Sequence, residues 1–188
     1  MPTALNKRLE ASIAVMLSLR KQIREIESIC EVIVERLRGD GTVYTCGNGG
    51  SAAEALHLAE ELIGRYRANR APLRAVCLNA DPTALTCIAN DFGFDDVFSR
   101  QCEALVTERD VLVVFSTSGR SRNVVRAVRA AKKSGAAVVA LLGGDGGDCA
   151  MEATDKVIVA SGDSAHVQEA HQVIMHLICE AAEAAFAT

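Results

Sequence analysis

The apolar residues of the first 38 positions recur at steps of three and four, which is the spacing of one face of a helix. The pattern runs from about Ala4 to Arg38 and stops at Gly39-Asp40-Gly41. It predicts a long N-terminal helical segment within residues 1–38. A helix of that length has a larger apolar face than one small core needs, so we expect part of it to pack against a second copy of the chain.

Short β-rich runs alternate with helical patterns over the rest of the chain. Residues 111–115 and 138–142 are apolar at every position, which is typical of parallel strands buried on both faces. With right-handed crossovers, this alternation builds a doubly wound α/β domain. The predicted strands are Thr42–Cys46, Ala75–Leu78, Val111–Phe115, Ala137–Leu142 and Lys156–Val159, and the chain closes with a helix at His166–Phe186.

The pattern contains no linker, repeat or low-complexity tract, so we predict a single domain over residues 1–188 with its α/β core at 42–186. Its five strands form one parallel sheet flanked by helices. In such sheets ligands bind at the carboxyl ends of the strands, near the point where the strand order reverses. The loops after the first and third strands are therefore the places to look for chemistry.

Charge and hydropathy exclude several classes of protein. Lys and Arg total 20 against 24 Asp and Glu, which gives a net charge of -4 and no broad basic surface for nucleic acid. No apolar run approaches the roughly 20 residues of a membrane span. The first thirty residues lack the features of a signal peptide. We expect a cytoplasmic protein that binds neither membranes nor nucleic acid.

Seven cysteines are scattered along the chain without a C-x-x-C pair. An odd, dispersed set does not suggest a disulfide framework or a zinc knuckle, so we expect reduced thiols that act as small core residues. Cys46 is the one cysteine that could lie near a ligand, because it ends a predicted strand beside a glycine-rich loop.

The loop after the third strand, Ser116–Ser121, carries four hydroxyl groups and one glycine just before a helical pattern resumes near Asn123. Hydroxyls and free backbone N–H groups at a helix N-terminus form a typical phosphate site. An ordinary helix cap needs only one Ser or Thr, so four favour phosphate. No Walker motif is present, which argues against nucleotide chemistry.

The loop after the first strand, Gly47–Ala52, fits the loose dinucleotide pattern G-x-G-x-x-A. That pattern requires an acidic residue at the end of the second strand, where this chain has Leu78-Asn79-Ala80. We therefore favour a loop whose glycines let a small sugar approach the backbone, with Asn48 and Ser51 as hydrogen-bonding residues.

Two polar stripes run along otherwise apolar helical patterns. His57 and Glu61 are four residues apart, and Gln168, Gln172 and His176 also follow at steps of four. If the stripes face one another, two imidazoles, a carboxylate and an amide oxygen could bind one zinc ion or form an acid–base set. The alternative is that these residues form a buried hydrogen-bonded network or an exposed polar face of a helix. His166 and His171 fit a structural role better.

Several segments, taken together and in order, resemble the phosphoheptose isomerases, a family of sugar isomerase (SIS) domain proteins. The resemblance covers about residues 40–180 and rests on Cys46–Ala52, His57–Glu61 with Gly64–Tyr66, Ala89–Phe94, Phe98–Arg100, Ser116–Gly119 and Gln168–His171 leading to His176. It implies one zinc ion per subunit, held by His57, Glu61, Gln168 and His176, in a homotetramer whose active sites lie between subunits. The substrate contacts that it implies come from Asn48, Gly49, Gly50, Ser51, Glu61, Asn90, Asp91, Ser116, Thr117, Ser118, Ser121 and Gln168.

The resemblance also implies an activity, the conversion of sedoheptulose 7-phosphate into D-glycero-D-manno-heptose 7-phosphate, a first step of nucleotide-activated heptose biosynthesis. Such an isomerisation needs a base, an acid and stabilisation of an enediolate. We expect Glu61 to be the base and His176 the acid. Glu61 is then assigned two roles, zinc ligand and free base, that conflict unless they belong to different steps.

The chain departs from the family pattern at three positions. Arg120 and Arg122 stand beside the phosphate loop, where the family usually has Asn and a small residue, and His166 replaces a common basic residue. Two alternatives therefore stay open: an isomerase of another phosphorylated ketose, and a non-catalytic SIS module that binds a sugar phosphate or a protein. The joint presence of His57, Glu61 and His176 favours an enzyme.

Overall fold

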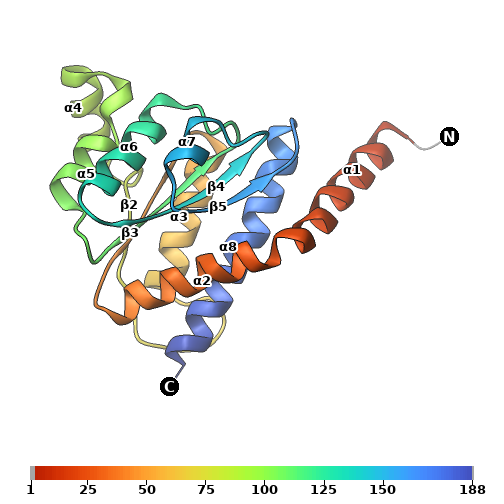
Figure 1. Cartoon of the computed structure of the whole chain (residues 1–188), viewed down its shortest axis with the longest axis horizontal. Helices are drawn as coiled ribbons and strands as arrows, with labels where there is room; N and C mark the ends of the chain where they lie inside the picture. Colours follow the sequence, from red (N-terminus) through yellow and green to blue (C-terminus); the bar gives the residue numbers. More distant parts are fainter. Residues whose placement is uncertain (1–2, 188) are drawn as a thin grey trace.

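Five parallel strands form one sheet in the order β2-β1-β3-β4-β5 in the computed structural model, which describes residues 3–187 (Figure 1). The strands are β1 (Val43–Gly47), β2 (Ala75–Cys77), β3 (Val111–Ser116), β4 (Ala137–Gly143) and β5 (Asp155–Val159). The predicted parallel sheet is thus confirmed, and every predicted strand boundary lies within one residue of the observed one. The strand order reverses at β1 and β3, where Gly47 lies opposite Phe115, so the loops that follow these strands are neighbours.

Helices cover both faces of the sheet and bury two separate cores. Successive residues of a strand point to opposite faces, so Val113 and Phe115 belong to one core and Leu112 and Val114 to the other. The first core is covered by α2 (Ile23–Arg38), α3 (Gly50–Ile63) and α8 (Ser164–Phe186). The second is covered mainly by α5 (Ser99–Leu105), α6 (Arg122–Lys133) and α7 (Gly147–Glu152), with α4 (Pro82–Phe92) and the 3-10 turn η2 (Phe94–Asp96) beside them.

The N-terminal segment is two helices rather than the single helix that its periodicity predicts. α1 (Ala4–Ser18) and α2 are separated by a 3-10 turn, η1 (Leu19–Gln22). At this turn the Gln22 amide donates to the carbonyl of Ile158 (2.9 Å) and accepts from the N–H of Ile158 (3.1 Å), so it pairs with the free edge of β5. The edge strand is thereby protected by a side chain.

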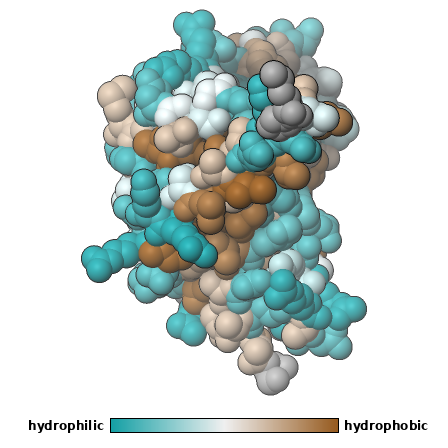
Figure 2. Space-filling model, turned by 90° about the vertical axis from the view of Figure 1, so that its right-hand side faces the viewer, coloured by the Kyte–Doolittle hydropathy of each residue, from teal (hydrophilic) through white to brown (hydrophobic). Residues whose placement is uncertain are grey.

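α1 extends away from the body of the molecule (Figure 1) and contributes no buried residue. It is held to α8 by two polar contacts, Arg8 to Asp163 at 2.9 Å and Ser12 to Glu169 at 2.6 Å. The large apolar side chains of α1 that are at least half exposed are Leu5, Leu9, Ile13 and Leu17. Figure 2 views the side from which α1 extends and shows apolar side chains gathered in one patch.

Within residues 3–187, none of the helices combines the length and the apolar character that crossing a membrane requires.

Candidate active site

The phosphate loop, residues 116–121, leads from the end of β3 into α6. The Ser116 hydroxyl accepts a hydrogen bond from the N–H of Gly119 at 3.0 Å, which folds the loop back on itself. Gly119 has a φ of 63°, and the carbonyl oxygen of Gly146 occupies the place that a side chain would need. Ser121 stands at the start of α6 without using its hydroxyl as a cap. Its hydroxyl and the first N–H groups of α6 are therefore available to an anion.

A cavity of about 60 Å³ lies between the phosphate loop and the glycine loop. The two loops meet there because β1 and β3 are adjacent in the sheet. Its lining residues are Asn48, Ser51, Phe115, Ser116, Thr117 and Ser121. The structure thus brings together five of the residues that the sequence assigned to substrate binding.

Two asparagines lock the glycine loop to the phosphate loop. Asn48 and Asn123 exchange two hydrogen bonds, both 2.8 Å, and Asn123 is almost completely buried. The Asn123 oxygen also accepts from the N–H of Val124 at 3.0 Å. The sequence predicts Asn48 as a substrate-binding residue but does not single out Asn123. The feature that could have identified Asn123 is its amide side chain in the first turn of the helix that follows the phosphate loop.

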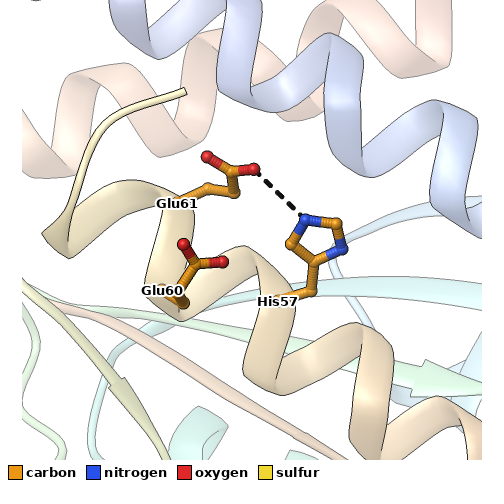
Figure 3. A group of neighbouring side chains, drawn as sticks. All are labelled: His57, Glu60 and Glu61. Carbon is orange, nitrogen blue, oxygen red and sulfur yellow. Dashed lines mark hydrogen bonds and ion pairs between the residues drawn. The ribbon is translucent and has the colours of Figure 1, made fainter. Parts of the chain in front are cut away.

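His57 and Glu61 project from the same face of α3, as their spacing predicts (Figure 3). His57 Nε2 lies 3.2 Å from Glu61 Oε1, and the Glu61 carboxylate is largely shielded, with 14% of its side chain exposed. Glu60 adds a third possible ligand atom: one such atom from each of the three residues lies within 4.8 Å of the other two. Imidazole nitrogen and carboxylate oxygen are donors that zinc accepts, so these residues fit such an ion.

The second histidine, His176, comes to this cluster from α8. Its ring centre is 5.5 Å from that of His57, nearly perpendicular to it, and it is stacked on Tyr66. Between the imidazoles lies Gln172, whose amide nitrogen is 2.8 Å from His57 Nδ1 and 3.3 Å from His176 Nε2. The two polar stripes therefore do face one another.

Gln168 lies elsewhere on α8. It packs on Gly50 at the start of α3, and a side chain at position 50 would collide with its amide. Eight residues separate Gln168 from His176, which is about 12 Å along a helix axis. Within one chain the structure brings Gln172, and not Gln168, to His57 and His176.

Asn90 and Asp91 also stand apart from the cavity. They lie near the end of α4, a helix with no buried residue. Their side-chain hydrogen bonds run from Asn90 to Asp91 at 2.7 Å and from the Cys87 thiol to Asp91 at 3.7 Å. Neither residue lines the cavity between the loops.

The two arginines beside the phosphate loop are paired with carboxylates. Arg120 forms a bidentate pair with Asp145 at 2.7 and 2.6 Å, and the guanidinium holds the pKa of that carboxyl well below its usual range. Arg122 lies 3.4 Å from Asp95. Much of the positive charge that they bring to the rim is thus offset by nearby negative charge.

The remaining histidines and Cys46 are buried. His171 is inaccessible to solvent: its Nε2 lies 3.2 Å from the carbonyl oxygen of Leu142, and its Nδ1 lies 3.8 Å from the buried carboxylate of Glu54. His166 is 7% exposed, 4.0 Å from Asp163. Cys46 points into the second core, where burial raises the pKa of its thiol well above the ordinary value. Such a thiol suits packing rather than nucleophilic chemistry.

Comparison with known proteins gives a consistent result. Residues 9–143 match the family model described as SIS domain. The chain is 48% identical over 162 residues to the phosphoheptose isomerase of Campylobacter concisus, covering 86% of this chain and 85% of that protein. Among solved structures, it is similar to a phosphoheptose isomerase from Francisella tularensis, with a TM-score of 0.92, 33% identity and coverage of 96% of each chain. It is also similar to the phosphoheptose isomerase from Neisseria gonorrhoeae, with a TM-score of 0.85, 38% identity and coverage of 96% of this chain and 100% of that one.

Proposed function

This chain belongs to the SIS domain family and, within it, to the phosphoheptose isomerases, and from that premise we propose that it isomerises sedoheptulose 7-phosphate to D-glycero-D-manno-heptose 7-phosphate. The observation that carries the proposal is the meeting of His57, Glu61 and His176 on two adjacent helices, one of which starts at the phosphate cavity. A module that only bound a sugar phosphate would need the cavity but not this acid–base cluster. The product would enter nucleotide-activated heptose biosynthesis in the cytoplasm.

The separation between the phosphate cavity and the acid–base cluster suits a sugar that is phosphorylated far from its carbonyl group. Ser51 lines the phosphate cavity, and His57 follows six residues later on α3, about 9 Å further along the helix axis. A phosphate on carbon seven and a carbonyl on carbon two are separated by most of the sugar chain. The pairing of Arg120 with Asp145 weakens the argument for another phosphorylated ketose, because it offsets the charge of that arginine at the rim.

In this proposal Glu61 removes the carbon-bound proton next to the carbonyl group, and His176 carries protons between the two oxygens. One Glu61 oxygen faces His57, whereas the other has no hydrogen-bond partner among residues 3–187. The carboxylate can therefore use one oxygen in the ligand cluster and the other as the base. This division reconciles the two roles that the sequence assigns to Glu61.

We propose that one zinc ion per subunit is held by His57, Glu61, His176 and Gln168. Bound there, zinc would supply Lewis-acid stabilisation of the negative charge that develops on the substrate oxygens. The nitrogen and carboxylate donors of His57 and Glu61 support the assignment, since their ligand atoms already lie 3.2 Å apart.

The same ligand set supports an oligomer, for which we propose a homotetramer. Within this chain Gln172, and not Gln168, lies between His57 and His176, whereas Gln168 packs on Gly50. A Gln168 supplied by a neighbouring copy would complete the set and place the active site between subunits. The exposed apolar face of α1 offers a surface for that association.

The test is to incubate the purified chain with sedoheptulose 7-phosphate, with and without a metal chelator, and to follow the products by NMR. We expect an aldoheptose 7-phosphate, and we expect the chelator to abolish its formation until zinc is restored. Absence of product with sedoheptulose 7-phosphate, together with turnover of another ketose phosphate, would overturn the substrate assignment. Activity that survives exhaustive chelation would overturn the role of zinc.

A further inference from the structure

Gln172 has no role in the isomerase chemistry described above, yet its amide touches both histidines of the site. We propose that Gln172 is a positioning residue, which sets the tautomer of His57 and so leaves the Nε2 of His57 free for a metal ion beside Glu61. The inference rests on the proposed zinc site and gives a role to the member of the polar stripe that the family resemblance leaves without one.

Without a metal, the neighbours of a neutral His57 ring decide which of its two nitrogens carries the proton. An ionised Glu61 carboxylate can only accept, so the Nε2 of His57 must donate to it. The Nδ1 of His57 then carries a lone pair and accepts from the Gln172 amide nitrogen at 2.8 Å. The second N–H of the same amide points to Nε2 of His176 at 3.3 Å. An amide turned the other way would set its oxygen against the lone pair of His57 Nδ1.

A zinc ion between His57 and Glu61 requires the opposite tautomer. The two facing atoms are 3.2 Å apart, close to the roughly 3.3 Å that separates two ligands of a tetrahedral zinc ion with bonds of about 2.0–2.1 Å. The ion takes the lone pair of Nε2, so the ring proton must move to Nδ1.

Glutamine at position 172 can serve both tautomers without moving its backbone. A half-turn of the amide puts its oxygen where its nitrogen was, and the oxygen then accepts from the Nδ1–H of His57. The same oxygen then also lies beside Nε2 of His176. A metal-bound histidine whose second nitrogen donates to an oxygen is the usual arrangement, and removal of such a partner typically weakens metal binding 10–100-fold.

Substitutions at this position separate hydrogen bonding from shape. In Gln172→Met the side chain keeps its length but cannot accept strongly from His57, whereas in Gln172→Glu the carboxylate accepts and favours the tautomer of the zinc-loaded site. We expect the zinc affinity of Gln172→Met to fall about 10–100-fold and that of Gln172→Glu to stay within about threefold of the wild type or to increase.

The experiment is a competition between the full chain and a chromophoric chelator for zinc, with melting temperatures as the check on folding. A histidine nitrogen-15 NMR spectrum, with the His57 signal assigned from a His57→Asn variant, reads the tautomer directly and needs only the wild type. We expect zinc to move the proton of His57 from Nε2 to Nδ1. A wild type that binds zinc without this change, a Met variant with wild-type affinity, or a Glu variant as weak as the Met variant would overturn the inference alone. A wild type that binds no zinc would overturn the proposed metal site as well.

Discussion

Replacing Gly119 by alanine measures how closely the phosphate loop is packed against the loop that follows β4. Gly119 has a φ of 63°, which costs an alanine about 1–2 kcal/mol. Its new methyl group would also overlap the carbonyl oxygen of Gly146 and strain the hydrogen bond from Cys149 N–H to Gly119 O. Overpacking of this kind costs about 1–3 kcal/mol. We therefore expect a total loss of about 2–5 kcal/mol in the free energy of unfolding.

Gly144 provides a matched control, because it has nearly the same φ of 64° but open space where a methyl group would lie. Gly144→Ala should lose only the backbone cost of about 1–2 kcal/mol. In urea, at one protein concentration, the midpoint of Gly119→Ala should lie about 1 M below that of Gly144→Ala for a slope near 2 kcal/mol/M. The displaced loop should also raise KM for the sugar phosphate. Equal midpoints would refute the claim that the two loops are in tight contact.

Three further predictions concern the site and the core. Glu61→Gln should lower turnover about 10²- to 10⁴-fold at saturating zinc and substrate while the melting temperature is kept, and near-normal turnover would exclude Glu61 as the base. Asn48→Ala and Asn123→Ala remove the same two hydrogen bonds, so urea denaturation of the double variant should show about 1–3 kcal/mol less loss than the sum of the single variants; additivity would contradict the pairing. Iodoacetamide at pH 8 should label the exposed Cys87 and spare Cys102, whose burial raises its pKa to about 12, as peptide mass spectrometry would show.

The strands and the two loops were predictable because they depend on short-range patterns. Fully apolar runs such as 111–115 can be satisfied only by burial on both faces, and a glycine loop that follows a strand marks the ligand edge of a parallel sheet. The face shared by His57 and Glu61 also follows from helical spacing alone.

The remaining features depend on contacts between distant segments. The break in the N-terminal helix arises because Gln22 pairs with Ile158, 136 residues later. Gln168 and Gln172 belong to the same stripe of α8. The position of α8 relative to α3 along the helix axis decides which of the two amides meets His57. The hydrogen-bonding partner of Asn48 could not be predicted either, because Asn123 lies 75 residues away in the sequence.

The exposed apolar face of α1 bears on the order in which the molecule is built. Ala4–Ser18 is synthesised before β1 to β5, yet none of its residues is fully buried in the finished fold, and its Val15 and Met16 pack against the first core while partly exposed. The helix leaves the ribosome with Leu5, Leu9, Ile13 and Leu17 uncovered, and these side chains remain at least half exposed in the folded chain. The polar contacts of Arg8 with Asp163 and of Ser12 with Glu169 can form only after a further 155 and 157 residues have been made, so α1 gains these partners late in synthesis.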